Sequence, residues 1–123
     1  MTIAGRVIAG LVFGVVIGAA SVASAGGWGA IAVDYRGDPS TTVYGIGRGG
    51  DVGEAGRAAT SLCVKAGGNN CRVVVSYTQC GAFAAGTSNV GWGMAMDKGT
   101  AEANARAGCG SSSCRVVVSD CTD

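Results

Sequence analysis

The residues of this chain with the most varied chemistry are its six cysteines, since thiols can bind metals, act as nucleophiles or form disulfide bonds. Metal binding and thiol catalysis find little support, because the chain has no C-x-x-C pair and no histidine. An even number of cysteines behind an export signal is typical of disulfide bonds. We therefore expect three disulfide bonds, and neither a metal nor a cofactor, from Cys63, Cys71, Cys80, Cys109, Cys114 and Cys121.

Acid–base chemistry would require carboxylates that converge on a substrate. Glu54 and Glu102 form a pair that could in principle perform it. Both fall near the expected start of a helix, where a carboxylate is stabilised by the helix dipole. We therefore favour a structural role for both residues and expect no catalytic residues.

One segment matches a cofactor-binding pattern. Residues 45–50, with the sequence GIGRGG, fit the G-x-G-x-x-G pattern of dinucleotide-binding turns. The acidic residue expected about 20 positions further on is absent, since Asn69 and Asn70 stand there, and Asp51 would repel a phosphate. We therefore interpret the segment as a glycine-rich turn between a strand and a helix.

Aromatic side chains are the remaining candidates for a binding site. Trp28, Tyr44, Phe83 and Trp92 are flanked by glycine and alanine, and a small domain must bury its largest side chains. We expect all four to fill the core. Any of them left exposed would instead be a binding anchor, and Trp28, Tyr44 and Trp92 are the candidates for this role.

An internal repeat shows which elements must position these residues. The segment CRVVVS at 71–76 recurs at 114–119, and the pattern before each copy indicates a strand, a second strand and a helix. We expect repeat one to cover residues 28–79 and repeat two to cover residues 80–121. The sequence therefore predicts a small disulfide-linked α+β domain of two β-β-α-β repeats, with an antiparallel sheet and two short helices. The expected strands are 28–33, 42–46, 72–78, 81–84, a segment around 92–93, and 114–119, and the expected helices are 51–66 and 100–108.

The first helix has recognisable start and packing signals. Asp51 can cap the exposed amides while Glu54 reaches back, as in a capping box. We match Glu54 to Glu102, and Tyr44-Gly45 to Trp92-Gly93. Because Glu102 precedes its cysteine by seven residues and Glu54 by nine, we expect a shorter second helix. The expected apolar face of the first helix, with Cys63 at its edge, consists of Val52, Ala55, Ala59, Leu62 and Ala66.

The repeat also restricts how the cysteines pair. One pair of cysteines flanks the loop between helix and third strand in each repeat, so equivalent positions favour equivalent bonds. The remaining two cysteines would then join the start of repeat two to the end of the chain. Exchange between the repeats, for example Cys63 with Cys109, remains the alternative. The favoured pairs are Cys63–Cys71, Cys109–Cys114 and Cys80–Cys121.

The first 25 residues have the features of a signal peptide. A short basic start is followed by the uncharged stretch 7–20 and by the small-residue pattern Ala23-Ser24-Ala25. Cleavage there would leave residues 26–123 as a single secreted domain without stable membrane insertion; the alternative is a retained membrane anchor. Removal of Arg6 changes the formal net charge from +1 to zero. A neutral domain predicts no binding to nucleic acid.

The order of these motifs resembles a known family. Trp28-Gly29-Ala30, Tyr44-Gly45, Cys71-Arg72-Val73-Val74 and Cys80-Gly81-Ala82 follow one another as in the domain of unknown function 4189 family, found in small secreted actinobacterial proteins, mycobacterial ones included. The resemblance covers residues 27–121. It implies export, disulfide bonds and a duplicated α+β domain, and it brings no activity and no catalytic residues.

These observations favour a small exported binding module that acts outside the cell. Its unknown partner would be an envelope component, another secreted protein or a host molecule. Two alternatives remain. One is a small carboxylate-based hydrolase acting on cell-wall material. The other is a structural envelope protein that associates with itself through sheet edges.

Overall fold

The computed structural model describes residues 27–123, so the predicted signal segment lies outside the described residues. Each half of the described chain runs strand, strand, helix, strand, which confirms the predicted α+β class. The first half contains β2 (Trp28–Asp34), the short helix η2 (Pro39–Thr41), β3 (Val43–Gly49), α3 (Val52–Lys65) and β4 (Arg72–Tyr77). The second half contains β5 (Cys80–Ala85), β6 (Val90–Ala95), α4 (Lys98–Cys109) and β7 (Arg115–Cys121).

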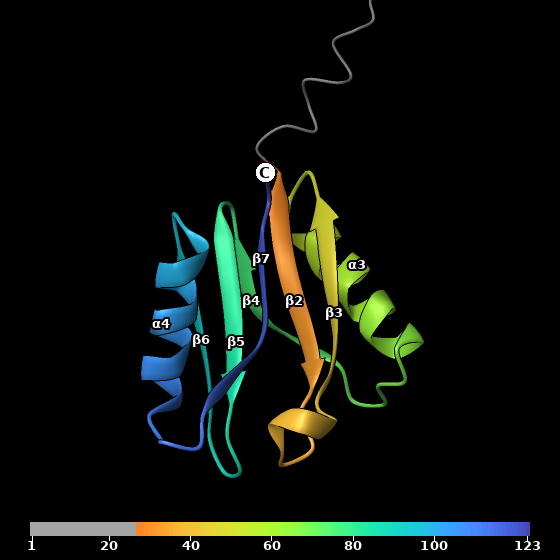
Figure 1. The fold of residues 1–123 in the computed structure, drawn as a ribbon. Coiled ribbons are helices and arrows are strands. Elements are labelled where there is room, and N and C mark those ends of the chain that lie inside the picture. The colour runs from red at the N-terminus through yellow and green to blue at the C-terminus, as the bar shows by residue number, and fades with distance from the viewer. Residues whose placement is uncertain (1–26) are drawn as a thin grey trace, which may run out of the picture.

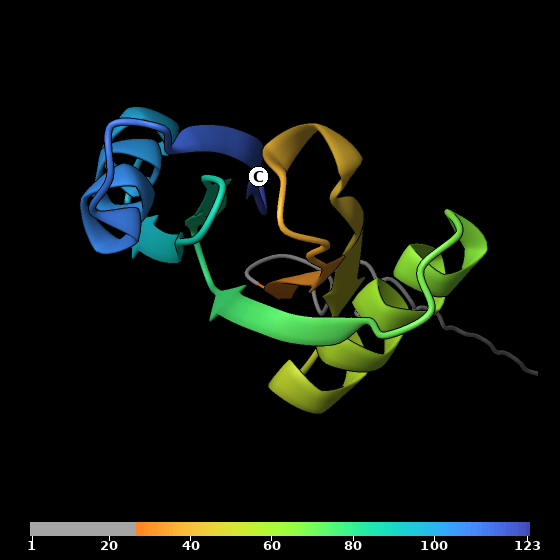
Figure 2. The same ribbon diagram turned by 90° about the horizontal axis from the view of Figure 1, so that it is seen from below.

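The strands form two antiparallel sheets, with the orders β3-β2-β4 and β6-β5-β7. The helices α3 and α4 cover the two outer sides of the molecule (Figure 1). Strands β4 and β7 lie on opposite faces of it (Figure 2). The main core lies between the sheets and is formed by Ile31, Val33, Val75, Tyr77, Phe83, Ala85 and Val118.

Glycines on β3 and β6 bring each helix unusually close to its sheet. A Cβ atom on Gly47 would collide with the backbone N of Ala59, and one on Gly91 would collide with the backbone N of Cys109. The smallest side chains of each helix therefore face the sheet: Ala55, Ala59 and Cys63 on α3, and Ala101, Ala105 and Cys109 on α4. The glycine-rich segment 45–50 is thus mainly a strand that packs on a helix, and β3 extends to Gly49 rather than breaking at Gly47 as expected.

This packing overturns the predicted apolar face of the first helix. Val52 and Leu62, expected to face the core, are 48% and 46% exposed, and Ala66 is exposed at the end of the helix. Cys63, expected at the edge of the face, is completely buried. The reason is steric, because only alanine and cysteine fit against the backbone of a glycine-containing strand.

The three consecutive valines of each repeat, at 73–75 and 116–118, are buried mainly on one face of their sheet. A β-bulge between Ile31 and Ala32 of β2 pairs them with Val75 and Val73 of β4. Val75 is buried, Val74 packs partly against the core, and Val73 is exposed beside α3. The same shift occurs in the second sheet, between Phe83 and Ala84 of β5. The bulge therefore turns two neighbouring valines of β4 towards the core.

The structure corrects the alignment of the two repeats. Asp51 and Asp97 are the N-caps of α3 and α4, and each precedes the buried cysteine of its helix by 12 residues. Counted from these caps, Glu54 corresponds to Thr100, and Glu102 corresponds to Gly56. The matching of Glu54 with Glu102 was therefore wrong. The second helix is nevertheless shorter, as expected, since α4 has 12 residues and α3 has 14. The difference lies after the cysteine, because α4 ends at Cys109 and α3 continues to Lys65.

The same correction applies to the strands. Ile46 pairs with Ile31, and Trp92 pairs with Phe83, and each pair lies at the β-bulge of its sheet. Trp92 therefore corresponds to Ile46, not to Tyr44 as expected.

Three disulfide bonds join the six cysteines, and no cysteine of the described chain is free. Two of them close the loop between helix and third strand in each half, over 8 and 5 residues of sequence separation. The third joins the first residue of β5 to the last residue of β7. The bonds are Cys63–Cys71, Cys109–Cys114 and Cys80–Cys121, the pairs that repeat symmetry favoured.

Candidate functional site

The three aromatic candidates for binding anchors do not converge. Trp28 pairs with Gly49 at one end of the β2–β3 ladder, Tyr44 pairs with Val33 near the other end, and Trp92 lies in the other sheet. Trp28 is half-buried against the alanine cluster under α3. Tyr44 and Trp92 are 40% and 52% exposed, so the expectation that both fill the core was wrong.

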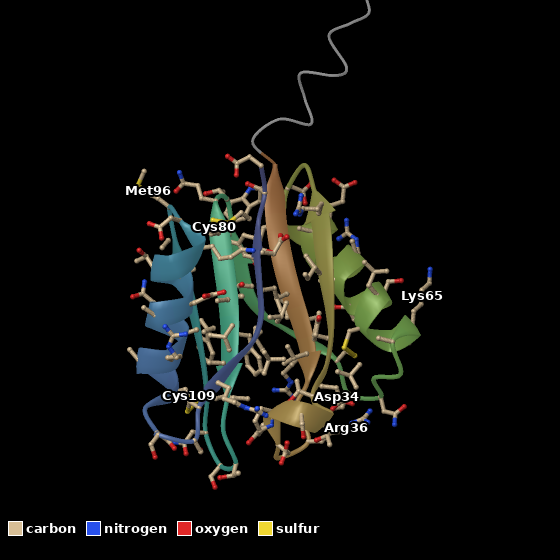
Figure 3. All side chains as sticks on the ribbon, viewed as in Figure 1. Asp34, Arg36, Lys65, Cys80, Met96 and Cys109 are labelled. Carbon is tan, nitrogen blue, oxygen red and sulfur yellow. A yellow bond between two sulfur atoms is a disulfide. The ribbon has the colours of Figure 1, made fainter. Side chains whose placement is uncertain are left out.

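Trp92 belongs to an exposed apolar strip on β6. Alternate residues of a strand point to opposite faces, so Gly91 and Gly93 face α4 while Trp92 and Met94 face the other side. Met94 is 57% exposed, and Met96, just after the strand, is 79% exposed. We call Trp92, Met94 and Met96 the β6 strip. Met96 extends from one end of the molecule near Cys80 (Figure 3).

Sequence reasoning missed the two methionines of the β6 strip. The signal was present, because large apolar residues at 92, 94 and 96 alternate with Gly91, Gly93 and Ala95. A period of two with small residues facing a helix predicts that the large residues face away from that helix. The alternation does not by itself show whether a second layer covers them.

The two halves use the positions of the strip differently. Ile46, the counterpart of Trp92, packs partly against the main core. Arg48, the counterpart of Met94, reaches across to Asp120 on β7. The first half therefore uses these positions for internal contacts, while the second half presents them to solvent. A small cavity of about 150 Å³ lies beside Met94 and Met96 and is also lined by Tyr77 and Thr78.

A polar network around the buried Tyr77 ties the two halves together near this cavity. The Tyr77 hydroxyl donates to Asp120 Oδ2 at 2.7 Å, and Arg48 binds both oxygens of the Asp120 carboxylate. Arg48 also donates to the backbone oxygens of Cys121 and Thr122. Burial, and then the hydrogen bond to Asp120, raises the pKa of Tyr77 far above its ordinary value. Tyr77 is therefore held neutral and is unsuited to act as a base or nucleophile.

The ring of Tyr77 is accommodated by two glycines. A Cβ atom on Gly29 of β2 or on Gly81 of β5 would collide with this ring. Tyr77 and Asp120 are equivalent residues of the two repeats, since Gly29 pairs with Tyr77 and Gly81 pairs with Asp120. One duplicated position has thus become a hydrogen-bond donor and its counterpart the acceptor.

A second polar cluster lies at the opposite end, near η2, where Asp34 and Arg36 point towards each other (Figure 3). Asp34 is buried and accepts from Arg36 at 2.9 Å and from the backbone N–H groups of Asn69 and Asn70. The Asn69 N–H, then the Arg36 guanidinium and the Asn70 N–H, hold the pKa of Asp34 below its ordinary value. These bonds fix the loop after α3 to the end of β2.

Other carboxylates also have structural partners. Asp51 accepts from the Glu54 N–H, and Glu54 accepts from the Gly50 N–H, close to the predicted capping box. Asp97 accepts from the Thr100 N–H. Glu102 accepts from the Ser119 hydroxyl at 2.6 Å. Glu54 and Glu102 lie on helices at opposite sides of the molecule (Figure 1).

Residues 27–123 lack two further features. In this part of the chain, no three side chains from His, Cys, Asp and Glu are grouped so that they could hold a metal ion. No helix within it is long and apolar enough to cross a membrane.

Fold and disulfide pattern together define a small, internally duplicated, disulfide-bonded α+β domain. The chain belongs to the family described as the domain of unknown function DUF4189, whose model matches residues 28–121. No curated protein and no solved structure matches it.

Proposed function

We propose that this protein is an exported, non-enzymatic binding module that contacts a protein partner outside the cell through the β6 strip. The exposure of Trp92 carries the proposal, because exposed tryptophans are frequent centres of binding energy in protein interfaces. Methionine side chains adapt to irregular surfaces, so Met94 and Met96 suit the border of such an anchor. The three disulfide bonds favour an oxidising, extracellular location.

The scaffold supports this role because it holds the strip rigidly. β6 is pinned to β5 along six residue pairs and to α4 through Gly91 and Gly93. A rigid anchor loses little conformational entropy when it binds. The alternative of a hydrolase finds no favouring observation, since the carboxylates described above serve caps, the Tyr77 network, loop attachment or, for Glu102, the contact with Ser119.

Self-association is the second candidate function, and one observation favours it. β6 is an edge strand, paired with β5 alone among the described residues, and an exposed edge strand can pair with a second chain. Apolar residues on an edge strand would strengthen such pairing. This candidate corresponds to the structural envelope protein that the sequence left as an alternative.

Capture and sedimentation experiments test both candidates. The oxidised protein would be immobilised and incubated with culture medium and envelope extract of the host that exports it. Trp92→Ala should abolish recovery of a specific partner, whereas Tyr44→Ala, which changes an aromatic of similar exposure in the other sheet, should not. Equal recovery by both variants would refute the role of the β6 strip. Analytical ultracentrifugation of the pure protein tests self-association, which predicts a dimer that Trp92→Ala dissociates.

A further inference from the structure

A groove between α3 and β4 is open in the first half of the molecule. Its volume is about 540 Å³, and Val52, Gly56, Arg57, Val73 and Ser76 contribute to its walls. Val52 and Val73 are exposed although both are apolar. The groove belongs to the outer side of the first sheet, so it is distinct from the β6 strip of the second sheet.

The second half shows what fills the equivalent place. Glu102 corresponds to Gly56, and Ser119 corresponds to Ser76. There the Ser119 hydroxyl donates to Glu102 Oε2 at 2.6 Å, and both residues are half-buried. Val116, the counterpart of Val73, is also half-buried. A glutamate side chain therefore occupies this place in the second half, where the first half has a glycine.

The polar groups of the open groove suit the same occupant. Within residues 27–123, the Ser76 hydroxyl makes no hydrogen bond and Arg57 makes no ion pair. The nearby carboxylate of Asp51 does not line the groove and accepts from the Glu54 N–H. A hydroxyl donor and a guanidinium beside an apolar wall complement a carboxylate on an aliphatic stem.

We propose that this groove binds a glutamate side chain from an extended segment of a partner protein, in the position that Glu102 occupies in the second half. The carboxylate accepts from the Ser76 hydroxyl and pairs with Arg57, while its methylene groups cover Val73. The inference does not depend on the β6 strip, because no residue is shared between the two surfaces.

A peptide titration tests the binding directly. The ¹⁵N-labelled oxidised protein would be titrated with acetyl-Val-Glu-Val-amide and, separately, with acetyl-Val-Gln-Val-amide, and amide shifts would be followed by NMR. The glutamate peptide should give saturable shifts centred on Gly56, Arg57 and Ser76. The glutamine peptide should bind with an affinity at least about five-fold lower, since charge-assisted hydrogen bonds are the stronger ones. Ser76→Ala and Arg57→Gln should each weaken the glutamate peptide. Equal binding of both peptides, or no shifts at the groove, would overturn the proposal.

A self-filling variant provides a second readout that needs no peptide. A Cβ atom at Gly56 would lie 3.4 Å from Val73 Cγ2, an ordinary contact, so a side chain can start here without a backbone clash. Gly56→Glu should copy the Glu102–Ser119 contact and melt about 2–4 °C above Gly56→Gln, which has a similar helix propensity. This difference should vanish in the Ser76→Ala background. The proposal would be refuted if Gly56→Glu melted no higher than Gly56→Gln and still bound the glutamate peptide like the unmodified protein.

Discussion

At the scale of single residues, the polar groups of this domain serve mainly to hold loops and halves together. Tyr77, Asp120 and Arg48 form the clearest case, because a buried phenol bridges equivalent positions of the two repeats. Removal of the Tyr77 hydroxyl would take one donor from the Asp120 carboxylate, which would keep its hydrogen bonds from Arg48. The network should therefore be visible in stability rather than in any activity.

Tyr77→Phe should lower the free energy of unfolding by about 1–3 kcal/mol, since it removes a part-buried hydrogen bond to a charged group. The contribution of Tyr77 to stability should also decrease at high pH. The folded state raises the pKa of Tyr77 above its unfolded value of 10.0, so its stabilising contribution is complete below pH 10 and is lost as the pH rises beyond it. Urea unfolding at pH 7, 10 and 11 measures both effects. A variant with the same loss of stability between pH 10 and 11 as the parent would contradict the assignment.

Asp34→Asn tests the second polar cluster in acid. Because hydrogen bonds lower the pKa of Asp34, its contribution is present above the unfolded pKa, near 3.8, and is lost as the pH falls through the lower folded value. The parent should therefore lose more stability than the variant between pH 5 and 2. Thermal melts across this range would show the difference, and Asp51→Asn, which changes a helix cap, serves as the comparison. Parallel acid profiles for Asp34→Asn and the parent would contradict the role of Asp34.

At the scale of elements, close packing of a helix on a glycine-bearing strand decides the fold. Gly45, Gly47 and Gly49 alternate along β3 and allow α3 to approach until backbone atoms limit the distance. The G-x-G-x-x-G match therefore has a packing explanation. The same device recurs at Gly91 and Gly93 under α4.

Gly47→Ala should destabilise the protein by about 1–3 kcal/mol or more, because the added methyl group meets the Ala59 backbone rather than a movable side chain. Gly56→Ala is the matched control, since its methyl group finds ordinary contact and alanine favours a helix by about 0.5–1 kcal/mol. Chemical denaturation of both variants gives the comparison. Equal stabilities would show that α3 can shift outward at little cost.

The order and type of these elements could be predicted from the sequence, but the rotation of the helices could not. The periodicity of α3 allows a face that includes Val52 and Leu62, and helical spacing alone prefers it because these are the largest apolar residues. The actual face is set by β3, whose glycines accept only Ala55, Ala59 and Cys63. A helical pattern read by itself lacks this information from its packing partner. For the same reason, the exposure of the β6 strip could not be predicted, because the sequence does not show whether another layer covers Trp92.

At the scale of the whole molecule, duplication and cross-linking work together. Each half closes its own loop by a short disulfide bond, and Cys80–Cys121 connects the beginning of the second half to its end. The repeat made this pairing predictable, because equivalent cysteines flank equivalent loops. Duplication also permits a position to make an internal contact in one half while its counterpart is open to solvent in the other. Ile46 and Trp92 are one such pair, and Glu102 and Gly56 are another.

Replacement of both Cys80 and Cys121 by serine should cost about 4 kcal/mol, because their bond closes a loop with a separation of 41 residues. Replacement of Cys109 and Cys114 should cost about 2 kcal/mol, since that separation is 5 residues. Urea midpoints of the two double variants under oxidising conditions test the order. A larger loss for the shorter loop would show that local strain or packing outweighs loop entropy.

The central claim is that the β6 strip is a contact surface, and the methionines provide a direct test. The chain contains three methionines, of which Met94 and Met96 lie in the strip and Met1 lies in the predicted signal segment. Growth of the native host with photo-methionine would therefore place the photoreactive group on the strip. Illumination of the culture, followed by mass spectrometry, should yield one dominant cross-linked protein, and Trp92→Ala should remove it. Absence of any cross-linked product from the parent, or an unchanged product from Trp92→Ala, would contradict the account.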